Sequence, residues 1–151
     1  MGALVAVNAF GDVVDEHGRI IAGARQLPGP GFANTLSVLR SRTGRAAMRF
    51  AGATVIGVVA TNARLNKEQA NKVAQMAHDG LARCVRPVHT LFDGDTLFAV
   101  ATGRVHASPT LVGGYTAEVM AQAILRGVRS AAAAGGLPAG AATDGGREAN
   151  G

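Results

Sequence analysis

The chain of 151 residues is poor in cysteine and in long apolar runs, and each shortage excludes a class of protein. Its one cysteine, Cys84, cannot form an internal disulfide or a cysteine cluster for zinc, and its place in a helical pattern favours a small core residue. No apolar run reaches the roughly eighteen residues of a membrane span, and residues 1–8 lack the basic start of a secretory signal. The sequence therefore predicts a cytoplasmic protein that does not enter a membrane.

Aromatic residues are also scarce, which argues against a nucleic-acid partner. Although the net charge is +5, aromatic residues make up 4% of the chain, the arginines are dispersed among Ala and Gly, and no run of five basic residues occurs. Metal ligands at close spacing are missing as well, because His17, His78, His89 and His106 form no helical pair four residues apart. We therefore expect no nucleic acid, no metal and no cofactor.

Small apolar residues are abundant, with 48% hydrophobic residues and 21 glycines, so one domain with a core of small side chains is expected. Residues 4–8 and 12–15 are β-favouring and flank a turn, which predicts a hairpin. Residues 55–61 and 96–102 are apolar runs rich in β-branched residues and are interpreted as further strands.

The sequence also predicts two helices. Asn66 and Gln69 resemble a capping box, and apolar residues spaced three and four apart continue the helix over residues 67–85. Thr116 is interpreted as the cap of a second helix that runs to about residue 132. Strands and helices together predict an α/β protein of the α+β class.

Acidic residues are absent from residues 25–53, which contain five arginines and a Leu-Pro-Gly-Pro-Gly stretch. This composition predicts a flexible linker. Thr54 follows the linker at the head of a buried strand, where a cut before it would free an amine to act as the base for its own hydroxyl. Residue type alone favours purely structural roles: Thr54 as a strand threonine, Asn8 as a turn residue, and residues 93–95 as a tight turn capped by carboxylates.

Four stretches, taken in order, resemble one known family. They are Val-Asn-Ala-Phe-Gly-Asp-Val-Val-Asp at 7–15, Thr-Val-Ile-Gly-Val-Val-Ala-Thr-Asn-Ala at 54–63, Gln-Ala-Asn-Lys-Val-Ala-Gln-Met-Ala-His-Asp-Gly-Leu-Ala-Arg at 69–83, and Phe-Asp-Gly-Asp-Thr at 92–96. Together they resemble the self-cleaving aminopeptidases of the DmpA and β-peptidyl aminopeptidase type, among which the nylon-oligomer endo-hydrolases look nearest. The resemblance covers about residues 3 to 130. It implies an αββα sandwich similar to that of N-terminal nucleophile hydrolases, made from a precursor that cuts itself into two subunits.

By position, the resemblance implies a role for individual residues. Thr54 matches the family's Ser or Thr that is both the autocleavage site and the nucleophile, so the cut is expected between Ala53 and Thr54. Asn8 matches the asparagine whose side-chain amide holds the oxyanion. Asp93 and Asp95 match the acidic pair that orients the nucleophile and its amine. Ala53 departs from the nylon-oligomer enzymes, which have Asn before the nucleophile.

The resemblance also implies an order of parts. Residues 1–24 would end the large-subunit core, 25–53 form the linker, 54–134 form the small subunit with the nucleophile, and 135–151 form a disordered tail. The family's large subunit continues upstream and supplies a lysine or tyrosine near the nucleophile, so we expect this chain to be an incomplete copy that lacks the upstream half. The implied partners are a peptide or oligoamide substrate, that upstream segment, and further copies in a homo-oligomer.

Three functions are therefore weighed. The principal one is a self-processing aminopeptidase or amidohydrolase. An acyltransferase similar to ornithine acetyltransferase also splits itself before a threonine, although its cleavage region differs from Ala-Thr-Val-Ile-Gly-Val-Val, and transfer of the acyl group to an amine would distinguish it. A non-catalytic fragment or assembly subunit is the third, and a reading frame continuous with Met1 on its upstream side would argue against it.

Overall fold

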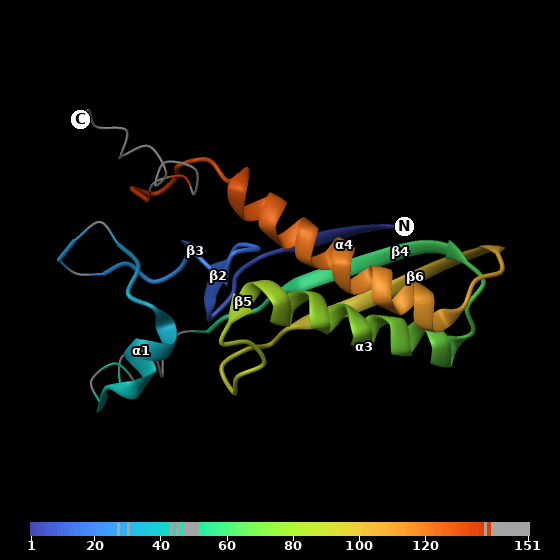
Figure 1. The fold of residues 1–151 in the computed structure, drawn as a ribbon, viewed down its shortest axis with the longest axis horizontal. Helices are drawn as coiled ribbons and strands as arrows, with labels where there is room; N and C mark the ends of the chain where they lie inside the picture. Colours follow the sequence, from blue (N-terminus) through green and yellow to red (C-terminus); the bar gives the residue numbers. More distant parts are fainter. Residues whose placement is uncertain are drawn as a thin grey trace.

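A computed structural model describes most of the chain, namely residues 1–26, 28–29, 31–42, 44, 46, 52–137 and 139. These residues form two three-stranded sheets and three helices (Figure 1), which confirms the α+β class. Most of the predicted tail lies outside the described residues. The αββα sandwich stays a prediction, since the described residues place one layer of helices on the larger sheet.

The larger sheet has the strand order β1-β4-β6, with bounds Gly2–Ala6, Ile56–Ala63 and Thr96–Val105. β1 pairs antiparallel with β4, and β4 pairs parallel with β6. A parallel pair needs a crossover connection, which the helix between β4 and β6 supplies. The strands predicted over 55–61 and 96–102 are confirmed, and both run further toward their carboxyl ends.

The smaller sheet has the order β3-β2-β5, with bounds Ile20–Ala22, Asp12–Val14 and Val85–Arg86. The predicted hairpin between 4–8 and 12–15 is wrong, because β1 pairs with β4 while β2 pairs with β3 and β5. The intervening Phe10 is buried, so the turn carries the chain inward from one sheet to the other instead of reversing it at a solvent-exposed tip.

Helix α3, Lys67–Cys84, begins as the sequence predicts. Asn66 accepts a hydrogen bond from the backbone N–H of Gln69 at 2.8 Å, and the Gln69 side chain accepts from the N–H of Asn66 at 3.0 Å. This reciprocal capping box satisfies two N–H groups that the first turn leaves without helical partners. The predicted helix over 67–85 is therefore confirmed, with Cys84 as its last residue.

Helix α4, Pro109–Arg129, begins earlier than predicted. Ser108 is the N-cap and Pro109 stands in the first turn, where its missing N–H costs nothing. The predicted cap at Thr116 is wrong: this residue is buried within the helix, and its hydroxyl donates to the carbonyl oxygen of Val112 at 2.8 Å. Ser-Pro and paired glycines indicate a loop in isolation, whereas packing against α3 makes them helical.

Both long helices cover one face of the larger sheet (Figure 1), and the main core lies between them and the strands. A glycine lets the helices approach closely, since a Cβ at Gly80 would lie 2.6 Å from the carbonyl oxygen of Ala117. The core is mostly Val and Ala, filled out by Leu81, Met120 and Ile124. Among the described helices, none has the length and apolar character needed to span a membrane.

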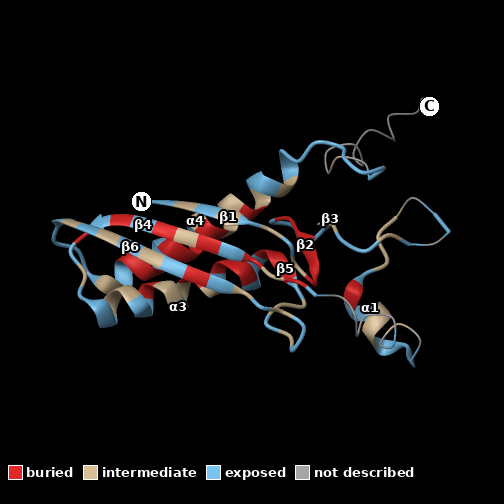
Figure 2. Cartoon of the chain, turned by 180° about the vertical axis from the view of Figure 1, so that it is seen from behind, coloured by how far each residue is buried: buried red, intermediate tan, exposed pale blue. Residues whose placement is uncertain are grey.

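The opposite face of the larger sheet carries exposed apolar side chains. Figure 2 views the sheet from behind, with β4 and β6 in front and alternating between buried and exposed residues. The exposed fractions are 75% for Leu4, 53% for Ile56, 57% for Phe98 and 50% for Val100. Such a row of large apolar residues is typical of a surface that another segment covers.

The stretch predicted as a flexible linker contains a short helix, α1, Thr35–Arg40. Its first residue, Thr35, is fully buried, and both its N–H and its hydroxyl donate to the buried carboxylate of Asp12, at 2.6 and 2.9 Å. The expectation of loop or disorder throughout residues 25–53 is therefore wrong at α1. A carboxylate from β2, distant in sequence, holds the helix start, and local composition does not reveal such a contact.

Replacing Asp12 with alanine should destabilise the fold, because it leaves two buried donors of Thr35 unpaired. We expect the free energy of unfolding to fall by about 1–3 kcal/mol for each donor. Urea unfolding followed by circular dichroism measures the change. Asp79→Ala, at an exposed position on α3, is the control and should change stability by about 0.5 kcal/mol or less. Equal stability of the two variants would mean that Asp12 does not anchor α1.

Candidate active site

The predicted site residues meet at one end of the larger sheet. Asn8 follows β1, Thr54 precedes β4, and Asp93 and Asp95 precede β6. Because β1 is antiparallel to the other two strands, its carboxyl end lies beside the amino ends of β4 and β6. The sheet topology thus gathers residues from three separate stretches of the sequence.

Both the N–H and the hydroxyl of Thr54 donate hydrogen bonds to backbone carbonyl oxygens. Its N–H donates to the carbonyl oxygen of Asn8 at 2.8 Å. Its hydroxyl donates to the carbonyl oxygen of the preceding Ala53 at 2.7 Å, and the N–H of Gly94 donates to the same oxygen at 3.0 Å. The Thr54 hydroxyl therefore lies against the peptide bond that the sequence predicts as the cleavage site, and a backbone donor polarises that carbonyl.

Gly94 allows this close approach. A Cβ at this position would lie 3.0 Å from the Thr54 hydroxyl oxygen, which is tighter than almost all van der Waals contacts made by real Cβ atoms. A side chain here would require the hydroxyl or the loop to shift by a few tenths of an ångström. The glycine of the Asp-Gly-Asp sequence therefore brings backbone up to a reactive group, as glycines do where the main chain must pass close to another group.

Asp95 and Asp93 hold different partners. One oxygen of Asp95 accepts the N–H of Val55, the residue after Thr54, at 2.9 Å, and the side chain is only 5% exposed. Asp93 turns into its own loop, where its carboxylate accepts the N–H and the hydroxyl of Thr90 at 2.7 and 2.8 Å. In this arrangement Asp95 fixes the backbone at Val55, just before β4, while Asp93 closes a turn.

Asn8 contributes its backbone to the site, and its side chain is exposed. The loop that follows it is fixed by Phe10, whose ring stacks on Phe92 with centroids 5.1 Å apart. This stacking ties the loop after β1 to the loop that carries Asp93 and Asp95. The expected roles of the Asn8 amide and of the acidic pair stay predictions.

A histidine pair beside Asp95 was missed by the sequence reasoning. His89 Nδ1 lies 3.8 Å from the second carboxylate oxygen of Asp95, and its ring packs on His78 with centroids 5.1 Å apart. Spacing along one helix does not reveal this pair, because His78 lies on α3 and His89 in a loop. The signal available in the sequence was His89, which stands four residues before Asp93. Within the described part of the chain, no cluster of three or more potential metal ligands occurs.

Cys84 is not an alternative nucleophile. The thiol is buried, it contacts the carbonyl oxygen of Gly80 at 3.2 Å, and burial raises its pKa to about 11. A thiol becomes a nucleophile as the thiolate, which is scarce at neutral pH when the pKa is this high. This confirms the interpretation of Cys84 as a core residue.

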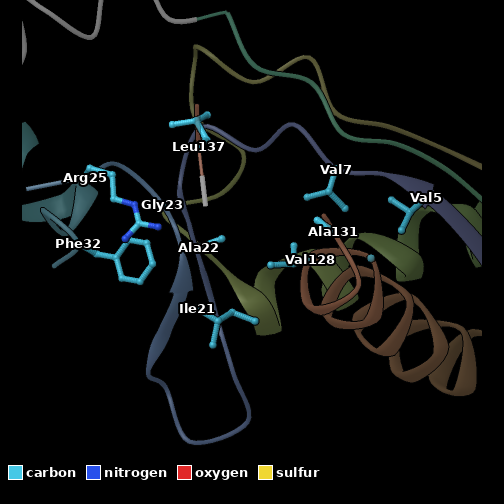
Figure 3. Close-up of a pocket in the computed structure, with 11 residues that line it drawn as sticks. Val5, Val7, Ile21, Ala22, Gly23, Arg25, Phe32, Val128, Ala131 and Leu137 are labelled. Atoms are coloured by element: carbon cyan, nitrogen blue, oxygen red, sulfur yellow. The ribbon is translucent and has the colours of Figure 1, made fainter. Parts of the chain in front are cut away.

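Figure 3 shows an apolar pocket of about 420 Å³. Its lining comes from β1, β3 and the end of α4, and the guanidinium of Arg25 lies 4.7 Å from the ring centroid of Phe32 at its edge. Thr54, Asp93 and Asp95 are not among its lining residues. The candidate active site at the sheet end is therefore separate from this pocket.

Comparison with known families identifies the chain. The sequence profile of peptidase family S58 matches residues 1–140. The chain belongs to peptidase family S58. Membership of S58 agrees with the resemblance to self-cleaving aminopeptidases and nylon-oligomer endo-hydrolases seen in the sequence motifs.

Proteins similar in sequence to this S58 chain carry the names of hydrolases. It is 35% identical to an uncharacterised aminopeptidase of Mycobacterium tuberculosis and 37% identical to one of Mycobacterium leprae, over 91% of its own length and 46% and 42% of theirs. It is 35% identical to the 6-aminohexanoate-oligomer endohydrolase of Kocuria sp., over 52% of its own length and 26% of that enzyme. The chain thus spans less than half the length of these relatives.

Proposed function

We propose that this chain is the nucleophile-bearing part of a self-processing amide hydrolase. Thr54 first cuts the bond between Ala53 and itself, and then attacks amide bonds in peptides or oligoamides. The observation that carries the proposal is the contact of the Thr54 hydroxyl with the Ala53 carbonyl at 2.7 Å. The relatives' names, aminopeptidase and oligomer endohydrolase, support hydrolysis over acyl transfer.

Self-cleavage follows from ordinary acyl chemistry at this peptide bond. The Thr54 oxygen forms a bond to the Ala53 carbonyl carbon, the C–N bond breaks, and the departing nitrogen takes the hydroxyl proton. Water then hydrolyses the ester, which leaves a carboxylate on Ala53 and a free amine and hydroxyl on Thr54. The Gly94 N–H already donates to the carbonyl oxygen that becomes negative, and such a donor is worth about 2.7–4 kcal/mol in the transition state.

Turnover would use the amine that the cut releases. An α-amine has an ordinary pKa of about 8, so a large share is neutral at weakly alkaline pH and can take the proton of the adjacent hydroxyl. Asp95 would hold the strand in place through Val55, and the amide of Asn8 would donate to the oxyanion of the substrate. Asp93 would keep the loop closed, with Gly94 beside the nucleophile.

We further propose that the exposed apolar face of the larger sheet is covered by a segment of the kind that the relatives carry beyond the matched region. Leu4, Ile56 and Phe98 present large apolar side chains on this face. The relatives are more than twice as long as the part they share with this chain, so material for a second layer exists in the family. This would complete the αββα sandwich that the sequence motifs imply.

Hydrolysis of a defined amide tests the proposed activity. The full-length protein, with any segment encoded upstream of Met1, is incubated with an amino-acid p-nitroanilide or a 6-aminohexanoate oligomer, with and without an added amine acceptor. We expect release of free amine whose rate does not depend on the acceptor, because water is the acyl acceptor. Product formed only when the amine is present would instead identify an acyltransferase, and no product in either case would favour a non-catalytic subunit.

A further inference from the structure

The two carboxylate oxygens of Asp95 face different neighbours. One oxygen of Asp95 holds the N–H of Val55, and the other lies 3.8 Å from Nδ1 of His89. The carboxylate is 5% exposed and the imidazole 43% exposed, so His89 covers Asp95 from the solvent side. At 3.8 Å the imidazole lies beyond hydrogen-bond length, and its position beside the second oxygen limits how far the carboxylate can rotate.

His89 occupies this place at a conformational cost. Its backbone φ is 56°, in the left-handed region that is uncommon for residues other than glycine, although Asn, Asp and His adopt it more often than the rest. A left-handed residue other than glycine is a reason to look for a function, because such backbone conformations are concentrated at functional sites. The next residue, Thr90, is anchored to Asp93, which fixes the loop that carries the imidazole.

A second imidazole supports the first. His78, on α3, packs on the His89 ring at a tilt of 58° with centroids 5.1 Å apart. Burial lowers the pKa of His78, the neighbouring His89 lowers it further, and Asp95 and Asp79 act in the opposite direction. The pKa of His78 therefore depends on both His89 and Asp95, and its lowered value favours the neutral ring near neutral pH.

We propose that His89 is a positioning residue for the reaction of Thr54. Supported by His78, it fixes the carboxylate of Asp95, which in turn fixes the backbone at Val55 and so the alignment of the adjacent nucleophile. The inference rests on the proposed function of Thr54 and adds a residue that acts through Asp95 without touching the substrate.

His89→Asn separates positioning from structure. Asn tolerates the left-handed backbone better than His, but its shorter side chain cannot reach Asp95 or cover His78. In the processed full-length protein we expect kcat to fall about fivefold, since a partly exposed contact of 3.8 Å is weak, with KM little changed and the melting temperature unchanged or higher. His106→Asn, at an exposed position after β6, is the control and should match the unmodified enzyme.

An NMR titration of His78 tests the geometry without any activity. His89→Asn should raise the pKa of His78, and Asp95→Asn should lower it, because each removes a charge that acts on that ring. Unchanged values in both variants would overturn the proposed contacts, and a wild-type kcat in His89→Asn would overturn the positioning role alone. An unmodified protein that neither cuts itself nor hydrolyses amides would overturn the proposed function and this inference with it.

Discussion

Replacing Thr54 with alanine should abolish both self-cleavage and amide hydrolysis. In the proposed mechanism the hydroxyl oxygen attacks in both reactions, and it lies 2.7 Å from the carbonyl oxygen of Ala53. Removal of a nucleophile leaves only the contribution of binding and oxyanion donors, so we expect kcat to fall by at least about a thousandfold. Electrophoresis shows the cut and a p-nitroanilide assay measures turnover in the full-length protein.

Two variants control this experiment. Thr54→Ser keeps a hydroxyl at the same position and should retain both reactions. Thr102→Ala removes an exposed strand hydroxyl of β6 that lies outside the site, and should leave both rates unchanged. A Thr54→Ala protein that still cuts itself, or still hydrolyses the amide at a comparable rate, would remove Thr54 from the mechanism.

Replacing Asn8 with alanine should lower kcat by about a hundredfold or more, because the side-chain amide is the expected donor to the substrate oxyanion. The backbone carbonyl that holds the Thr54 N–H is kept in this variant, and the side chain is exposed, so folding should be preserved. Steady-state kinetics on processed protein and a thermal unfolding curve separate the two effects. Asn62→Ala, an exposed asparagine of β4, is the matched control.

The kinetic parameter that changes decides the role of Asn8. A donor that acts mainly in the transition state lowers kcat and kcat/KM together. An increase in KM at unchanged kcat would place Asn8 in substrate binding, and a lower melting temperature would make it a structural residue. Either result would contradict the oxyanion assignment.

Local signals in the sequence predicted the elements on which the site stands. The Asn66 and Gln69 capping box and the apolar runs at 55–61 and 96–102 identify α3, β4 and β6 because each depends on near neighbours in the chain. Thr116 misled because threonine is favoured at helix N-caps, whereas here its hydroxyl donates to Val112 four residues earlier inside a helix that packs on α3.

The site itself could be predicted in part. Thr54, Asn8 and the acidic pair were found through motif order, and the sheet topology brings them together. Motif order does not reveal which aspartate accepts which hydrogen bond, because Asp93 and Asp95 are the same residue type in one short loop. In the structure Asp95 accepts the N–H of Val55 and Asp93 accepts that of Thr90. The structure gives each carboxylate its own donors.

Intact-mass measurement of the purified full-length protein, followed over time, tests the central claim most directly. The expected result is conversion of one species into two, with masses that place the cut between Ala53 and Thr54 and a free threonine amine on the carboxyl-terminal product. A time course with Thr54→Ala in parallel shows whether the protein itself makes the cut. A single uncut species after long incubation, or a cut at any other bond, would contradict the assignment of Thr54 as a self-released nucleophile.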